Sequence, residues 1–213
     1  MTKATKIKTA KKVYTNKATY QTTYPMNDNK KQEIFVTKDK DLIKQYYELR
    51  NRIFREEWGL THEKWSKTEH DDGAGIVVYT VDGKVRGGLK IFISKDGELL
   101  PEEYEGTEYV YSNLLKRLDL ECGKRYAEFA DLVIDKEFQG AGILQEIGKV
   151  CVIDVKSNGC EYIFCVAPLR YCRSYKRYGM FSGCKEVRIF SDTQWVQSEE
   201  YNDSKDYPTI AVL

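Results

Sequence analysis

The strongest chemical pattern in the chain is an apolar strand, expected over 126–134, that runs into a glycine-containing turn. The turn has the sequence Gln139, Gly140, Ala141, Gly142, and a helix is predicted to begin there. Two glycines at such a junction let main-chain N–H groups point outward without a Cβ in the way. The first helical turn adds unpaired N–H groups and the positive end of its dipole. The pattern favours a phosphate site, although a tight strand–helix connection would also need glycine.

This segment resembles the pyrophosphate loop of the GNAT superfamily of N-acyltransferases. The family pattern is an apolar strand, a few polar residues, and then Arg/Gln-Gly-x-Gly-x-Gly/Ala. Leu144 departs from it, since the family has a small residue there. The resemblance implies an acyl-coenzyme A cosubstrate, acetyl-CoA or longer, and no metal. The residues implied to hold its pyrophosphate are Gln139, Gly140, Ala141, Gly142 and Ile143.

The same resemblance implies a sheet whose two central strands splay apart, one ending at Ile134 and the other at Val166. The acyl-pantetheine arm would lie between them. Main-chain groups of Leu132, Val133 and Ile134 would bond the pantetheine amides, and one of those N–H groups would hold the oxyanion of the tetrahedral intermediate. The implied fold class is α/β (α+β), GNAT-like, with a mixed, partly antiparallel central sheet flanked by helices.

A second segment, from Val166 to Met180, resembles the GNAT strand and helix that end in Tyr-x-x-x-Gly-Phe. Tyr175 stands at the position of the tyrosine that faces the acyl thioester, and Met180 replaces the phenylalanine. A phenol is useful there, because the thiolate that leaves when an amine attacks a thioester must be protonated. The resemblance implies that Tyr175 is the general acid. The alternative is a half-buried structural tyrosine.

The reaction also needs a base, because a substrate ammonium with a lysine-like pKa of about 10.4 must lose a proton before it can attack. Glu128 and Asp131 are the candidates on the strand that leads into the site. They are three residues apart, so strand alternation is expected to place them on opposite faces. Glu128 is the predicted base, by resemblance and because it stands away from the tight turn. The alternative is a solvated or salt-bridged carboxylate.

The N-terminal half resembles a narrower group, the acyl-homoserine lactone synthases and N-acyl amino acid synthases. These are GNAT-fold enzymes that take long acyl chains, often from acyl carrier protein. The resemblance therefore adds acyl carrier protein as a second possible donor. The matching segments are 49–58, 70–72, 87–90, 99–101 and 128–131.

In those enzymes the first helix and an acidic pair form the amine-substrate side of the site. Two positions depart from the group: Lys90 and Asp131 stand where arginine is expected. Lysine lacks the bidentate fork of arginine, so a substrate carboxylate would be held differently. The alternative for the helix residues is plain packing on the sheet. The implied substrate-binding residues are Arg50, Phe54, Trp58, Asp71 and Asp72.

The length of 213 residues allows one domain with a full core. The formal net charge is only +1, but residues 1–31 carry eight lysines against one acid. We predict a flexible basic arm over 1–32 and a GNAT-like acyltransferase domain over 33–213. The arm could touch nucleic acid or acidic lipid, but a solvated tail is the expectation.

No apolar run approaches the ~18–20 residues that span a bilayer, and the N-terminus lacks the apolar stretch of a secretory signal. The six cysteines include no Cys-x-x-Cys pair, which argues for free thiols in a reducing compartment and against a zinc site. The sequence therefore predicts a cytoplasmic protein.

Apolar periodicity and turn residues predict the order of elements. The expected strands are 33–37, 75–81, 85–94, 126–134, 161–166, 186–190 and 209–213. The expected helices are 39–58, 112–120, 142–158 and 169–178.

The predicted function is an N-acyltransferase that moves an acyl group from an acyl-CoA or acyl-carrier-protein thioester to a small-molecule or peptide amine. One alternative is an acetyl-CoA-dependent N-acetyltransferase of a small amine or a protein amine. A second is a non-catalytic acyl-CoA-binding regulatory domain.

Overall fold

The structure, a computed structural model, describes residues 22–23, 31–58, 73–94, 113–120, 124–139, 142–193 and 206–213. Its strands are β1 (Thr22–Thr23), β2 (Gln32–Thr37), β3 (Gly75–Val81), β4 (Lys84–Ile93), β5 (Tyr126–Ile134), β6 (Tyr162–Pro168), β7 (Glu186–Ile189) and β8 (Asp206–Val212). Its helices are α1 (Lys40–Trp58), the 3-10 helix η3 (Lys136–Phe138), α3 (Ile143–Ser157) and α4 (Leu169–Arg177), with a helical turn at 113–116. None of these helices is long and apolar enough to cross a bilayer.

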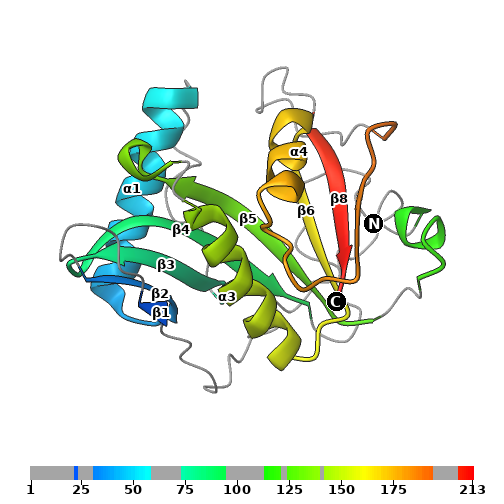
Figure 1. Cartoon of the computed structure of the whole chain (residues 1–213), viewed down its shortest axis with the longest axis horizontal. Helices are drawn as coiled ribbons and strands as arrows, with labels where there is room; N and C mark the ends of the chain where they lie inside the picture. The colour runs from blue at the N-terminus through cyan, green and yellow to red at the C-terminus, as the bar shows by residue number, and fades with distance from the viewer. Residues whose placement is uncertain are drawn as a thin grey trace, which may run out of the picture.

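The strands form one eight-stranded sheet in the order β1-β2-β3-β4-β5-β6-β8-β7 (Figure 1). Every neighbouring pair is antiparallel except β5 and β6, which are parallel. The predicted mixed, partly antiparallel α/β fold is therefore confirmed. Thr22 and Thr23, which pair with β2, lie inside the segment predicted as the basic arm.

The two central strands splay apart, as the sequence resemblance implied. The β5–β6 register ends where Glu128 meets Phe164. Beyond that point β5 continues to pair with β4, and β6 continues to pair with β8. Figure 1 shows β5 and β6 close together near the C-terminus and apart at their other ends, where α4 lies.

Helices α1 and α3 cover opposite faces of the sheet. Tyr46 and Phe54 of α1 pack with Val78 and Val133, whereas Ile147 and Cys151 of α3 belong to the larger core on the other face. Helix α1 begins at Lys40 because the Asp39 carboxylate accepts hydrogen bonds from the main-chain N–H groups of residues 41 and 42.

Most predicted boundaries agree with the structure to within one or two residues. The last strand differs, because β8 begins at Asp206 rather than at Thr209. The segment predicted as a helix over 112–120 keeps only one helical turn, followed by hydrogen-bonded turns. Gly159 follows α3 with a φ of +75°, the left-handed conformation in which a glycine commonly ends a helix.

Asp154 is a buried carboxyl of α3 whose Oδ2 atom has no hydrogen-bond partner. Burial raises the pKa of Asp154 to about 6, above the value of an unfolded aspartate. The folded protein therefore binds a proton at Asp154 that the unfolded chain releases near pH 4. The free energy of unfolding therefore falls as the pH rises from about 4 to 6. Above pH 6 Asp154 lowers it no further.

We expect Asp154→Asn, which is neutral at every pH, to remove this destabilisation. The free energy of unfolding should rise by roughly 1–2 kcal/mol at pH 8 and change little at pH 4, after discounting for partial solvent screening. Urea titrations at both pH values measure this, with Glu137→Gln at an exposed position as the control. Equal pH dependence in Asp154→Asn and the wild type would contradict it.

Candidate active site

The candidate site is built around the gap between β5 and β6. Past Glu128 and Phe164, the two strands bond only to their outer neighbours. The backbone groups of β5 that face away from β4 are therefore not used by β6. The residues predicted to contact the pantetheine arm, Leu132, Val133 and Ile134, all lie on the part of β5 that does not pair with β6. An extended ligand with amide groups could occupy such a strand edge.

A β-bulge interrupts β5 beside the gap. Gly88 pairs with Val133 but Lys90 pairs with Ala130, so β5 carries one residue more than β4 at this point. Asp131 lies in the bulge with a φ of +51°, a left-handed conformation that few residues other than glycine adopt.

The bulge reverses the alternation of side chains along β5. Ala127 and Phe129 before it, and Leu132 and Ile134 after it, all pack into the core beneath α3. A regular strand would have turned the second pair to the other face, because successive side chains alternate. The extra residue therefore keeps both apolar pairs in one core.

The prediction that Glu128 and Asp131 lie on opposite faces is wrong, and the bulge is the reason. Glu128 alternates with Ala127 and Phe129, so it lies on the face that α1 covers. The Asp131 carboxylate also reaches that face, where it contacts Arg50 of α1. Both candidate carboxylates are thus on the same side of β5.

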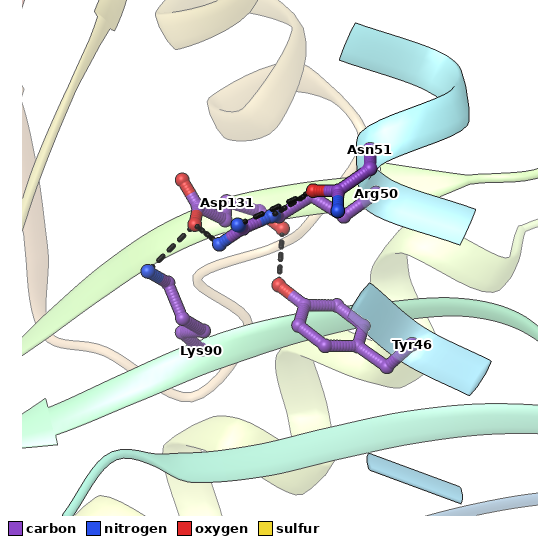
Figure 2. Close-up of polar contacts among 5 residues, drawn as sticks. All are labelled: Tyr46, Arg50, Asn51, Lys90 and Asp131. Atoms are coloured by element: carbon purple, nitrogen blue, oxygen red, sulfur yellow. Dashed lines mark hydrogen bonds and ion pairs between the residues drawn. The ribbon is translucent and has the colours of Figure 1, made fainter. Parts of the chain in front are cut away.

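Asp131 is the centre of a buried ion cluster that links α1, β4 and β5 (Figure 2). Its Oδ2 atom accepts hydrogen bonds from Arg50 Nη1 at 2.7 Å and Lys90 Nζ at 2.6 Å. The exposed fraction of the side chain is 2% for Arg50, 9% for Lys90 and 18% for Asp131. The Tyr46 hydroxyl donates to the Asp131 main-chain oxygen at 2.7 Å.

The ion cluster determines which of the two candidate carboxylates, Glu128 or Asp131, is better suited to accept a proton. Burial alone would raise the pKa of Asp131, but the Lys90 ammonium and the Arg50 guanidinium outweigh it and lower that pKa. An ionised carboxylate with a lowered pKa is a weak base. Glu128, half-buried at the vertex of the gap, stays the predicted base.

Only some of the predicted substrate-binding residues are among those that the structure describes. Arg50 belongs to the ion cluster, and its guanidinium also lies over the rings of Tyr47 and Phe54, at 4.8 and 6.0 Å from the centroids. Phe54 is buried in the core between α1 and the sheet. The Trp58 side chain and residues Asp71 and Asp72 lie outside the described residues, so their substrate role stays a prediction.

The predicted phosphate loop connects β5 to α3. The Gln139 side chain donates to the Ile134 main-chain oxygen at 3.0 Å and ties the loop to the end of the strand. Gly142 precedes α3 with a φ of +78°, and no side chain caps the helix. The Leu144 side chain packs against the larger hydrophobic core, which accommodates it. Gly140 and Ala141 lie outside the described residues.

A second ion group anchors the start of this loop. The Asp135 carboxylate contacts Arg86 of β4 at 3.1 Å and Arg52 of α1 at 3.4 Å. The Arg86 guanidinium lies over the Phe138 ring, 5.5 Å from its centroid. The end of β5 is therefore fixed to both neighbouring elements just before the glycine turn.

Tyr175 lies on α4, which follows β6 directly. Its ring stacks on Tyr171 with centroids 6.3 Å apart and packs against the main core. Within the described residues its hydroxyl has no hydrogen-bond partner. Burial, followed by the nearby Cys165 and Cys172 thiols, raises the pKa of Tyr175. The phenol therefore keeps its proton at neutral pH, as a general acid must.

The elements around the gap thus carry the predicted base, the residues predicted to bind pantetheine and the predicted acid. Sequence reasoning missed Tyr46, because the apolar periodicity that predicts the helix over 39–58 gives no sign of a hydrogen bond from its hydroxyl. Its partner is the main-chain oxygen of a bulge residue. Asp135 was also missed, since one acid in a polar turn gives no signal of its partners.

No protein-family model matches the sequence, and no curated protein matches it. Several solved structures do match the chain. FeeM, an N-acyl amino acid synthase from uncultured soil microbes, superimposes with a TM-score of 0.57 and 12% identity, covering 87% of this chain and 91% of FeeM. The chain has a GNAT-like fold.

Two further solved structures with this GNAT-like fold match nearly as well. BjaI, a CoA-dependent acyl-homoserine lactone synthase, has a TM-score of 0.55 and 14% identity over 82% of this chain and 77% of BjaI. An acetyltransferase from Streptococcus agalactiae has a TM-score of 0.53 and 12% identity over 85% of this chain and 98% of that protein. At such identities the likeness is one of fold, and it includes both groups to which the sequence was compared.

Proposed function

We propose that the protein is an N-acyltransferase that moves an acyl group from an acyl-CoA thioester to an amine. The observation that carries the proposal is the stretch of β5 that pairs with β4 but not with β6, followed by the start of α3, where Gly142 provides no side-chain cap. An acyl-pantetheine arm fits the strand edge by its amides. Its pyrophosphate fits the N–H groups of the helix start.

The proposed chemistry assigns one role to each group. Glu128 takes a proton from the acceptor ammonium, and the freed nitrogen attacks the thioester carbonyl carbon. A main-chain N–H group among residues 132–134 holds the resulting oxyanion. The C–S bond then breaks, and Tyr175 donates its proton to the departing thiolate. The acceptor nitrogen loses its second proton as it becomes an amide, and this proton returns to the Tyr175 phenolate.

Direct transfer is favoured over a route through an acyl-cysteine. Such a route needs a thiolate nucleophile. Burial raises the pKa of every described cysteine, so these thiols stay protonated at neutral pH. They are Cys151, Cys160, Cys165, Cys172 and Cys184.

The charge of α4 supports a phosphate-bearing donor. The helix carries Arg170, Arg173, Lys176 and Arg177 and no acidic residue. Coenzyme A and the phosphopantetheine of an acyl carrier protein both offer phosphate to such a surface. The likeness of fold to BjaI, which is CoA-dependent, favours acyl-CoA.

The second candidate function is acetyl transfer to a small amine or a protein amine, favoured by the fold shared with the S. agalactiae acetyltransferase. A series of acyl-CoA donors from acetyl to dodecanoyl separates the two. Binding of each donor to the protein is first measured by calorimetry. The protein and donor are then incubated with a panel of amines while CoA release is followed. Failure of every acyl-CoA to bind the folded protein would overturn the proposed function.

The phosphate loop gives a sharper test. We expect Gly142→Asp to weaken CoA binding by roughly tenfold or more, because it places a negative charge beside the pyrophosphate. Gly159→Asp is a matched control at the other end of α3. Both glycines have a positive φ, +78° and +75°, and a Cβ at either meets nothing within 4 Å. Equal dissociation constants for the two variants, measured by calorimetry, would contradict the loop assignment.

A further inference from the structure

Asp131 occupies a left-handed backbone conformation, which glycine adopts most readily and which aspartate tolerates better than most other residues. Its φ of +51° is one that glycine adopts readily and other residues rarely. The left-handed residue of a β-bulge of this kind is commonly glycine. Contacts from neighbouring elements stabilise Asp131 in this conformation.

Two independent sets of contacts do so. The carboxylate is fixed from one side by Arg50 and Lys90, both of which bond its Oδ2 atom (Figure 2). The main-chain oxygen of the same residue is fixed by the Tyr46 hydroxyl. Neighbouring elements thus hold both the side chain and the main-chain oxygen of Asp131.

Gly88 is what allows Tyr46 to reach the bulge. A Cβ at Gly88 would lie 2.7 Å from the Tyr46 ring and 2.6 Å from the Val77 main-chain oxygen. The ring therefore lies directly on the glycine of β4. From there its hydroxyl is aimed at the Asp131 carbonyl, so Gly88 is part of the same arrangement.

We propose that Asp131 is a positioning residue, which holds the β5 bulge so that those main-chain N–H groups of residues 132–134 that face the gap are aimed at the acyl thioester. The inference rests on the proposed function, because it concerns the donor bound in the gap. The bulge sets the direction of β5 immediately before those three residues. Arg50, Lys90 and Tyr46 act on the thioester only through Asp131.

The test compares Asp131→Ala with Asp131→Gly. Both variants lose the carboxylate, but only glycine adopts a positive φ without strain. The probe is acetyl-CoA labelled with ¹³C at the thioester carbonyl. In the wild type, hydrogen bonding should shift the carbonyl stretch of the bound probe to lower frequency. Asp131→Ala should lose this shift, and Asp131→Gly should keep it.

Turnover gives the second measurement, once a donor and acceptor pair is found. Asp131→Ala should lower kcat by about 10²–10³-fold, as expected for a misplaced oxyanion donor, with a smaller change in donor KM. Asp131→Gly should recover most of the lost kcat. Equal losses of shift and kcat in the two variants would overturn the proposal, since the carboxylate itself would then be what matters.

Tyr46→Phe covers the case in which neither Asp131 variant folds, because it leaves the ion cluster intact. It should weaken the carbonyl shift, whereas Tyr79→Phe, which loses a buried hydrogen bond to Gln32 elsewhere, should not. An unchanged shift in Tyr46→Phe would overturn the positioning role. A wild type that binds no acyl-CoA would instead overturn the proposed function, and this inference with it.

Discussion

Replacing Tyr175 with phenylalanine is expected to lower kcat by about 10²–10⁴-fold, the usual contribution of a general acid. The substitution keeps the ring, so the stacking on Tyr171 and the packing against the core should persist. Donor KM should therefore change little. Steady-state kinetics with a donor that the wild type turns over measures both constants.

The control for this experiment is Tyr178→Phe, at an exposed tyrosine one turn further along the chain. It should leave kcat unchanged. The pH dependence adds a second check, because burial raises the pKa of Tyr175 and the phenol stays protonated throughout the neutral range. Wild-type kcat in Tyr175→Phe across pH, with chemistry rate-limiting, would mean that the tyrosine is structural and that water protonates the thiolate.

Gly148→Ala is expected to destabilise the fold by roughly 3 kcal/mol or more. A Cβ at this position of α3 would lie 2.1 Å from the Met180 main-chain oxygen and 2.6 Å from its Cα atom. The added Cβ would press on the Met180 backbone, which cannot move aside as a flexible side chain would. Helix α3 would have to move away from the segment that follows α4.

Gly142→Ala serves as the comparison, because a Cβ there meets nothing within 4 Å. Its positive φ should cost only about 1–2 kcal/mol. Urea denaturation of both variants gives the free energies of unfolding. Similar losses at the two positions would show that the contact with Met180 relaxes easily.

The sequence predicted those parts of the fold that depend on local pattern. The apolar run of β5, the strands expected over 75–81 and 85–94, and the helix expected over 142–158 each appear where residue types along the chain predicted them. The splay of β5 and β6 followed from the resemblance to GNAT enzymes. The roles of Glu128 and Tyr175 remain predictions.

Features that depend on contacts between distant segments could not be predicted. The bulge at Asp131 is set by Arg50, Lys90 and Tyr46, which come from other elements, and it reversed the expected face of the carboxylate. Lys90 and Asp131 were noted only as departures from a family motif. The structure shows that they are partners in one ion cluster.

The position of β8 has a consequence for how the protein is made on the ribosome. Strands β2 to β5 are neighbours in the order in which they are synthesised, but β8 pairs with both β6 and β7, which come earlier. Until residues 206–212 emerge, one edge of β6 is an exposed template for pairing with other chains. Helix α4 packs against β6 and β8 together. The candidate acid on α4 therefore reaches its working position only after the last strand is in place, and a nascent chain lacking that strand would carry an unfinished site.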